Sequence, residues 1–331
     1  MRVLVTGATG CLGGALVRRL ATEGIDATAS GRSHCAGREL ERSGIRFAPA
    51  ELTDRPAIDA LTAGHDTVVH CGGLSAPWGA AKAFALANVD GTRNAVDAAL
   101  RHGVRRFVFI STPSLYFDFR ERFNITEDAP LAQRPVNAYA ASKAEGEKIV
   151  RDAMARGLAA VIVRPRAIIG PGDTALLPRL LRVAKRGVLP LIDGGRAVID
   201  LTYVDNAADA LVALVRASDH VDGKTYNISN GEPSSVAALF SGIVAALRLR
   251  TRFVSIPFSV AYAAASAFEA AARLLPGCPE PALTRYSVGV LGRSQTLSIA
   301  AARRDFGFRP RVPLQEGIER TAAALRPAYA R

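Results

Sequence analysis

Tyr139 and Lys143 are the two residues whose types and spacing most directly predict chemistry. They stand four positions apart in Tyr139–Arg156, a segment with a helical pattern, so their side chains share one helix face. Free tyrosine titrates near ~10, and an ammonium group close by favours the phenolate. The pair therefore predicts a tyrosine that exchanges a proton with an alcohol or a ketone. Such a pair also occurs by chance on solvated helix faces, so the prediction depends on further residues.

A glycine-rich turn at the start of the chain predicts a dinucleotide site. Gly7, Gly10 and Gly13 lie between a strand-like run, Arg2–Val5, and a helical pattern, Leu12–Glu23. Glycine permits positive φ and a close approach of the backbone to phosphate. The helix that follows offers free N–H groups and a partial positive charge to a pyrophosphate.

The residue after the second strand bears on which dinucleotide is bound. In NAD sites an acidic residue at this place binds the ribose 2′-hydroxyl. Here Asp26–Ser30 is followed by Gly31 and Arg32. An arginine can pair with a 2′-phosphate, which a carboxylate would repel. We therefore expect NADP(H) to be preferred, with NAD(H) possible. The alternative is that Arg32 is a solvated loop residue and that the site accepts either cofactor.

The elements that must position these residues alternate between strand and helix. Strand-like runs occur at Arg2–Val5, Asp26–Ser30, Arg46–Ala48, Thr67–His70, Arg106–Ser111, Ala159–Val163, Val198–Val204 and Thr225–Ile228. Helical patterns occur at Leu12–Glu23, Phe84–His102, Tyr139–Arg156 and Pro257–Leu275. This alternation predicts an α/β fold with a doubly wound parallel sheet of the Rossmann type. The runs lack a polar alternation, as expected for a sheet covered on both faces.

The sequence pattern changes after Arg164-Pro165, where loops and short segments replace the regular alternation of strand-like runs and helical patterns. A chain of 331 residues has room for two lobes. We expect a Rossmann dinucleotide-binding domain over 1–170, completed by about 197–230. A smaller C-terminal substrate lobe is expected mainly from 171–196 and 231–331.

Composition and charge favour an ordinary globular protein. The formal net charge is +12, from 42 Lys and Arg against 30 Asp and Glu, but the basic residues are scattered and mixed with acids. That pattern argues against nucleic-acid binding. It reflects an arginine-rich composition or the attraction of an anionic ligand. The four cysteines have neither metal-ligand nor disulfide spacing. We expect no metal, no signal peptide, no membrane-spanning segment and a cytoplasmic location.

Taken together, the motifs resemble the extended short-chain dehydrogenase/reductase family. The G-x-x-G-x-x-G spacing of Gly7–Gly13 is one such match, and Ser111–Tyr116 resembles the family's strand-end S-[ST]-x-x-x-Y segment. Further matches are His70–Gly73 with H-x-A-[AG], Asn88–Thr92 with N-V-x-G-T, Arg164–Asp173 with R-P-x-x-x-x-G-P-G-D, Tyr203–Asn206 with V-D-N, and Tyr226–Glu232 with Y-N-I-x-x-G-E. The resemblance covers most of the chain.

The resemblance implies roles for individual residues. Thr112, Tyr139 and Lys143 would be catalytic: Thr112 would bind the substrate oxygen, and Lys143 would also hold the nicotinamide ribose. The resemblance and the patterns above together predict cofactor contacts for Gly7, Thr9, Gly10, Cys11, Leu12, Gly13, Arg32, Glu51, Leu52, Cys71, Gly72, Gly73, Asn88, Ser111, Tyr139, Lys143, Pro165 and Ile168. Glu51 stands where the family usually has aspartate beside the adenine.

The resemblance also narrows the reaction. Dehydratases of the family carry Asp-Glu after the catalytic threonine, where this chain has Pro113 and Ser114. A sugar-nucleotide 4-epimerase with tightly bound NAD remains an alternative, disfavoured by an NADP-type arginine. A non-catalytic dinucleotide-sensing regulator is a second alternative, but such proteins commonly lose the tyrosine.

The chain resembles the 3β-hydroxysteroid dehydrogenase branch, which includes bacterial 2-alkyl-3-oxoalkanoate reductases. Phe258, Tyr262 and Phe268 suit a largely apolar substrate, although they would also suit an ordinary packed helix. The expected reaction interconverts a ketone and a secondary alcohol on a β-keto acid, a β-keto ester or a sterol-like compound. Residues expected to line the substrate pocket are Trp78, Ser114 and Arg166. Family members often dimerise through two helices, which here would be Phe84–His102 and Tyr139–Arg156.

Overall fold

A parallel sheet of seven strands forms the larger part of the computed structural model. The structure describes residues 1–173, 177–185 and 187–329, with side chains described as far as residue 326. The strands lie in the order β12 (Thr225–Ile228), β7 (Ala160–Pro165), β5 (Arg106–Ile110), β4 (Thr67–His70), β1 (Arg2–Thr6), β2 (Asp26–Gly31) and β3 (Arg46–Pro49). Every neighbouring pair is parallel, which confirms the doubly wound Rossmann-type sheet. The strand order reverses between β1 and β4, where open α/β sheets bind their ligands.

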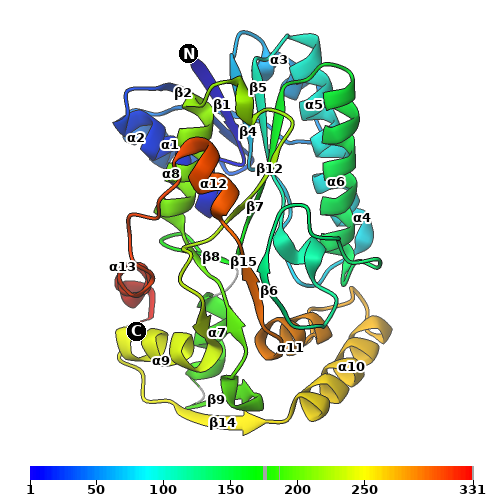
Figure 1. The fold of residues 1–331 in the computed structure, drawn as a ribbon, viewed down its shortest axis with the longest axis vertical. Coiled ribbons are helices and arrows are strands. Elements are labelled where there is room, and N and C mark those ends of the chain that lie inside the picture. The colour runs from blue at the N-terminus through cyan, green and yellow to red at the C-terminus, as the bar shows by residue number, and fades with distance from the viewer. Residues whose placement is uncertain (174–176, 186, 330–331) are drawn as a thin grey trace.

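Helices cover both faces of this sheet (Figure 1). One face carries α1 (Cys11–Thr22), α2 (His34–Arg42), α8 (Val204–Arg216) and α12 (Ala300–Phe306), and the other carries α3 (Arg55–Thr62), α5 (Gly91–Arg101) and α6 (Ala138–Ala155). Val3 and Val5 of β1 point into the first core, whereas Leu4 points into the second. Because both faces are buried, the strands are apolar without alternation.

The predicted helix Phe84–His102 is three consecutive helical segments. They are α4 (Ala81–Phe84), the π-helical segment η1 (Ala85–Asp90) and α5. Asn88 lies inside η1 and is fully buried. π-helical turns inside helices often occur at functional sites, because the wider turn redirects a side chain. A single wide turn leaves the helical pattern of the sequence nearly intact, so the pattern predicted one continuous helix.

The predicted strand Val198–Val204 is wrong in extent. The structure has β10 (Val198–Ile199) and β11 (Thr202–Tyr203), and Val204 already begins α8. Between the two strands, the carboxylate of Asp200 accepts a hydrogen bond from the backbone N–H of Leu297 at 2.6 Å. This contact lies where the chain leaves one small sheet and enters another.

A smaller lobe lies beyond the carboxyl ends of the large sheet (Figure 1). Its four-stranded sheet has the order β13 (Ser234–Ser235), β10, β15 (Gln295–Leu297) and β6 (Arg122–Ile125), and β8 (Ile168–Ile169) pairs with β11 and β9 (Val188–Ile192) with β14 (Arg252–Ile256). The helices beside these strands are α7 (Leu177–Ala184), α9 (Val236–Ala246), α10 (Phe258–Leu274), α11 (Arg285–Gly292) and α13 (Leu314–Tyr329). Short 3₁₀ turns are η2 (Pro113–Tyr116), η3 (Asp193–Gly195) and η4 (Asp219–Val221).

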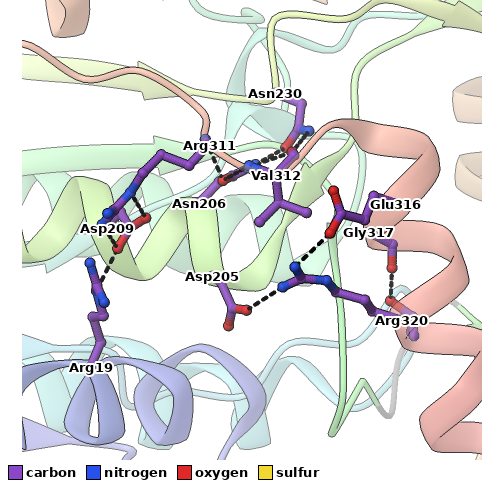
Figure 2. Close-up of polar contacts among 11 residues, drawn as sticks. Arg19, Asp205, Asn206, Asp209, Asn230, Arg311, Val312, Glu316, Gly317 and Arg320 are labelled. Atoms are coloured by element: carbon purple, nitrogen blue, oxygen red, sulfur yellow. Dashed lines mark hydrogen bonds and ion pairs between the residues drawn. The ribbon is translucent and has the colours of Figure 1, made fainter. Parts of the chain in front are cut away.

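The two lobes are joined by a hydrogen-bonded clamp at the start of α8 (Figure 2). The side-chain oxygen of Asn206 accepts from the backbone N–H groups of Arg311 and Val312 at 2.9 and 3.0 Å. Its amide nitrogen donates to Val312 O and to Asn230 at 2.8 and 2.9 Å. The Arg311 guanidinium also contacts both carboxylate oxygens of Asp209. In this structure the Tyr203–Asn206 motif therefore fastens the segment before α13 to the large domain.

Candidate functional site

The glycine turn after β1 lies directly against the turn after β4. Gly7 has φ +68°, and a Cβ added to it would lie 2.6 Å from the Cα of Gly72. A Cβ on Gly13 would lie 2.4 Å from the carbonyl oxygen of Gly7. Helix α1 begins after Gly10 without a side-chain cap and without an acidic residue in its first turn. These uncapped N–H groups, beside backbone with no room for a side chain, fit a pyrophosphate.

Other residues of the predicted cofactor site surround this turn. Thr9 packs against the end of β2, since its Oγ1 would lie 2.6 Å from a Cβ on Gly31. The Cys11 thiol contacts Pro171 O at 3.6 Å, and burial raises its pKa to about 12, so it stays protonated. Leu12 points into the core, which leaves only its backbone for a ligand. Pro165 is the buried last residue of β7, and Ile168 packs against the same small hydrophobic cluster as Cys11.

The turns after β2 and β3 form the opposite end of the predicted cofactor site. Arg32 directly follows β2 and is exposed, as is Glu51 after β3. The Leu52 side chain would lie 2.8 Å from a Cβ on Gly72 and 2.7 Å from one on Gly91. Leu52 is thus wedged between the turn after β4 and the start of α5.

The predicted pairing of Arg32 with a 2′-phosphate can be tested by replacing Arg32 with Ala. We expect the KM for NADPH to rise about 10-fold or more and the KM for NADH by less than about 2-fold, since a charged hydrogen bond to phosphate would be lost. The measurement is initial-rate kinetics with both cofactors. Arg38→Ala, which removes an exposed arginine from α2, is the control for net charge. Equal effects of Arg32→Ala on both cofactors would contradict this assignment.

His70 of β4 links β1 to α5 through its two ring nitrogens. Its Nδ1 is hydrogen-bonded to Thr6 Oγ1 at 2.8 Å and its Nε2 to Thr92 Oγ1 at 3.3 Å. The ring stacks on Phe107 and Phe109, with centroids 5.8 and 6.0 Å away. Burial lowers the pKa of His70 to about 3, so the imidazole is neutral at physiological pH.

Asn88 ties the loop after β4 to the helix that carries Tyr139. Its side-chain oxygen accepts from Leu74 N at 2.6 Å, and its amide nitrogen donates to Leu74 O and to Ser142 Oγ at 3.0 and 2.8 Å. A Cβ on Gly73 would lie 2.7 Å from Asn88 Oδ1 and 3.5 Å from Lys143 Nζ. The preceding Cys71 has a pKa raised to about 12 by burial and is a protonated thiol.

Tyr139 and Lys143 project from the first turns of α6 towards the end of β5. Asn137 caps this helix by accepting from Ala140 N at 2.8 Å. Lys143 is buried, and its Nζ donates to Ile110 O at 2.7 Å. The hydroxyl of Tyr139 interacts with the side chains of Thr112 and Ser75, both of which act to lower its pKa. The structure therefore brings Thr112, Tyr139 and Lys143 together at the carboxyl edge of the sheet.

The electrostatics of Tyr139 differ from the sequence-based expectation. Burial raises the pKa of Tyr139, and the side chains of Ser75 and Thr112 only partly oppose that rise. Lys143 is not among the groups that shift it, and the pKa of Lys143 itself is lowered to about 8 by burial. The ammonium group is directed at Ile110 O instead. Tyr139 is thus a neutral phenol here, suited to donating a proton.

A chain of hydroxyl groups leads from Thr112 to the smaller lobe. Thr112 Oγ1 donates to Ser114 Oγ at 3.0 Å, and Ser114 Oγ is hydrogen-bonded to Tyr286 OH at 2.7 Å. Tyr286 lies on α11 and was not predicted as a site residue, nor was Ser75. The segment around Tyr286 carries no motif. The Thr284–Ser287 capping box could have indicated a helix start, but not that the helix faces the site.

Two other predicted substrate residues lie where the lobes meet. Trp78 Nε1 donates to Cys278 O at 3.0 Å, and the guanidinium of Arg273 lies 5.0 Å from the Trp78 ring centroid. Arg166 is buried directly after β7, and its Nη1 donates to Oε1 of Gln295 on β15. Gln295 was likewise missed by the sequence analysis.

The aromatic residues predicted for an apolar pocket are divided between two environments. Phe258 and Tyr262 stack at 5.7 Å, and Phe119 meets Tyr262 edge-on at 5.6 Å. Phe117 in turn contacts Phe119 and the ring of Tyr286. Phe268 instead lies on the exposed face of α10. A continuous series of ring contacts therefore leads from Phe258 to Tyr286, which is the end of the hydroxyl chain.

Arg164 holds α6 against the sheet, and Ser111 joins the end of β5 to β7. The Arg164 guanidinium donates to both carboxylate oxygens of Glu147 on α6, at 2.7 and 2.6 Å, and also to Tyr116 OH. Ser111 is buried after β5, and its backbone N–H donates to Val163 O at 2.7 Å. Both positions act on the placement of α6 and β5.

The described residues contain neither a metal-binding cluster nor a membrane-spanning helix. Across 1–173, 177–185 and 187–329, no three His, Cys, Asp or Glu residues are grouped so that they could hold a metal ion. In the same part of the chain, no helix is long and apolar enough to cross a bilayer.

Comparison with known proteins places these motifs in context. Residues 3–229 match the NAD dependent epimerase/dehydratase family model. The chain is 37% identical to 2-alkyl-3-oxoalkanoate reductase of Stenotrophomonas maltophilia (strain K279a), over 98% of this chain and 99% of the relative. It is 33% identical to 4-hydroxy-2-methyl-3-oxo-4-farnesyl-3,4-dihydroquinoline-1-oxide ketoreductase of Stigmatella aurantiaca, over 99% and 96% of the two chains.

A likeness to solved structures extends over the whole chain. UDP-glucuronic acid 4-epimerase from Bacillus cereus in complex with NAD superposes with a TM-score of 0.78 at 19% identity, covering 99% of this chain and 100% of that one. At this identity the likeness concerns the fold alone. The sequence matches confirm the family resemblance that the motifs indicated.

Proposed function

The chain belongs to the NAD-dependent epimerase/dehydratase family and is an NAD(P)-dependent oxidoreductase, and from this premise we propose that it interconverts a ketone and a secondary alcohol on a largely apolar substrate. The substrate class is a β-keto acid, a β-keto ester or a sterol-like compound. Support comes from the names of the two relatives, both of which reduce a ketone, and from the aromatic residues Phe258 and Tyr262 near the hydroxyl chain.

The observation that carries this proposal is the convergence of Thr112, Tyr139 and Lys143 beside the two glycine turns. A bound nicotinamide dinucleotide supplies or accepts the hydride. Thr112 donates a hydrogen bond to the substrate oxygen and stabilises the charge that develops there. Tyr139, kept neutral by burial, donates its proton to the ketone oxygen during reduction and takes it back during oxidation. Lys143 holds the nicotinamide ribose with its ammonium group.

NADP(H) is the cofactor we propose, with NAD(H) as a possible second. Arg32 is placed to pair with a 2′-phosphate, because it is exposed directly after β2 and no acidic residue stands at the end of that strand. Residues 1–170 with about 197–230 would hold the cofactor, and 171–196 with 231–331 would hold most of the substrate. A homodimer through Phe84–His102 and Tyr139–Arg156 is part of the same proposal.

The experiment is to purify the protein, identify any dinucleotide that co-purifies, and follow NADPH and NADH consumption with β-keto acids, β-keto esters, sterol ketones and sugar nucleotides. The proposal expects turnover with net cofactor consumption on an apolar β-keto compound and no activity on sugar nucleotides. Tightly bound NAD, together with sugar-nucleotide conversion and no net consumption of added NADPH, would instead identify a 4-epimerase. Cofactor binding without turnover on any substrate would favour a regulator.

A further inference from the structure

Arg166 is a buried cation whose hydrogen-bonding capacity is only partly used. Its side chain is 3% exposed. Nη1 donates to Gln295 Oε1, whereas Nε and Nη2 have no hydrogen-bond partner. The amide nitrogen of Gln295 is buried and unpaired as well. Buried donors are nearly always paired, and a buried charge is costly unless it is compensated. These three unpaired donors outnumber the one unpaired acceptor that acts on Arg166, Oδ1 of Asp200, and therefore point to a further acceptor from outside the chain.

The groups that face Arg166 come from three elements of the smaller lobe. They are Gln295 of β15, Tyr286 of α11 and Asp200 between β10 and β11. Asp200 acts on Arg166 electrostatically, but within the described ranges the two form no ion pair. Oδ2 of Asp200 accepts from Leu297 N at 2.6 Å, whereas its Oδ1 is buried without a hydrogen-bond partner, and burial raises the pKa of this carboxyl group. Burial likewise lowers the pKa of Arg166.

Arg166 is also connected to the reacting groups. Tyr286, which acts on Arg166 electrostatically, is hydrogen-bonded to Ser114 at 2.7 Å, and Ser114 accepts from Thr112 at 3.0 Å. Thr112 lies two residues after β5 and Arg166 directly follows β7, its neighbour in the sheet, so a substrate whose ketone oxygen is bound by Thr112 and Tyr139 lies at the same edge of the sheet as Arg166. The backbone of Arg166 is fixed there, since its N–H donates to Ile228 O at 2.9 Å.

We propose that Arg166 binds a carboxylate of the substrate next to the reacting carbonyl, so that the enzyme acts on free β-keto acids rather than on their esters or on sterol-like ketones. This inference rests on the proposed ketone–alcohol function. The unpaired Nε and Nη2 are the two nitrogens on one side of the guanidinium, which is the arrangement that holds both oxygens of a carboxylate. In a β-keto acid a single carbon separates the ketone from the carboxylate, so both groups can be bound within one small site.

The two relatives do not decide this question by themselves. A 2-alkyl-3-oxoalkanoate carries a carboxylate, whereas the quinoline oxide named for the other relative does not. The competing explanation within the structure is that Arg166 serves only as a distant counter-charge for Asp200. The experiment must separate these possibilities.

The substrates for the test are a 2-alkyl-3-hydroxyalkanoic acid and its methyl ester. Oxidation is measured because β-keto acids lose carbon dioxide spontaneously. We expect the wild-type enzyme to favour the acid by about 100-fold in kcat/KM, since a buried arginine left unpaired by the ester rejects it. Arg166→Gln should lower kcat/KM for the acid about 100-fold and for the ester less than about 3-fold. Arg166→Lys should retain part of the preference, because lysine keeps the charge but not the fork.

The double variant Arg166→Gln with Asp200→Asn tests the counter-charge explanation. Our proposal expects it to oxidise the acid as poorly as Arg166→Gln alone. Recovery of acid oxidation would overturn the proposal, as would equal losses on acid and ester, or a wild-type enzyme that uses both equally. The wild-type comparison decides the matter even if the variants fail to fold, which thermal unfolding and dinucleotide binding would reveal. Turnover of neither acid nor ester, with no ketone reduced in the wider screen, would contradict the proposed function itself.

Discussion

The Tyr139→Phe variant is expected to lose about 10³-fold or more in kcat while it retains dinucleotide binding, because the change removes the group that exchanges a proton with the substrate. The Tyr139 hydroxyl interacts with the side chains of Thr112 and Ser75, and burial, which raises its pKa, keeps it protonated. Phenylalanine preserves the ring that packs against Phe84 at 6.2 Å between centroids. Steady-state kinetics and fluorescence titration with the cofactor measure the two quantities separately.

Tyr226→Phe is the matched control for this prediction. It removes the same hydroxyl from a buried tyrosine on β12, where the group bonds Asp305 at 2.9 Å away from Thr112. We expect kcat to change less than about 3-fold in that variant, since only a structural hydrogen bond is lost. A Tyr139→Phe enzyme with wild-type kcat would rule out the proton-transfer role. The regulator alternative is favoured if Tyr139→Phe retains dinucleotide binding and a cellular effect while neither this variant nor the wild-type protein shows oxidoreduction.

The second large effect is expected from Gly13→Ala. A Cβ at Gly13 would lie 2.4 Å from the carbonyl oxygen of Gly7 and 2.8 Å from its carbonyl carbon. Both atoms belong to the backbone of the cofactor turn, which cannot yield without moving the N-terminus of α1. We expect the Kd for the dinucleotide to rise about 100-fold or more and the free energy of unfolding to fall by about 1–3 kcal/mol.

Gly14→Ala provides the comparison for this variant. Its Cβ would meet Ala8 O at 3.2 Å and the flexible end of Arg18 at 3.4 Å. These contacts are tight, but they do not involve the close approach of Gly13 to the Gly7 backbone. We therefore expect the Kd for the dinucleotide to change by less than about 5-fold. Calorimetric titration and thermal unfolding of both variants measure the difference. Similar losses in the two would mean that alanine impairs α1 generally rather than the cofactor turn.

The large sheet could be predicted from the sequence because its determinants are local. Thr67–His70 and Thr225–Ile228 have the predicted bounds, and α6 begins one residue before Tyr139. Short apolar runs, glycine turns and helical patterns each depend only on residues that are close together in the sequence. The same holds for the glycine turn after β1, whose glycines are required by close backbone contacts within the strand–turn–helix unit.

The residues that the sequence did not reveal depend on contacts between distant segments. Tyr286 reaches Ser114, and Gln295 reaches Arg166, only because the smaller lobe folds onto the end of the sheet. The break at Asp200 in the predicted strand Val198–Val204 coincides with a hydrogen bond to Leu297 N, which no local pattern signals. Likewise, the neutral state of Tyr139 follows from burial, which a Y-x-x-x-K spacing does not report.

The packing of α1 against α8 has a consequence for how the protein is made on the ribosome. Leu16 and Leu20 of α1 share a core with Leu211 and Leu214 of α8, although the two helices lie at opposite ends of the sheet-forming sequence. At synthesis rates of roughly 5–20 residues per second, the apolar face of α1 waits on the order of 10–40 s before its partner emerges. During that interval the nascent chain exposes a hydrophobic stripe beside an unfinished sheet. The dinucleotide-binding turn is thus synthesised first but can become stable only late, and the interval is one in which chaperones can bind.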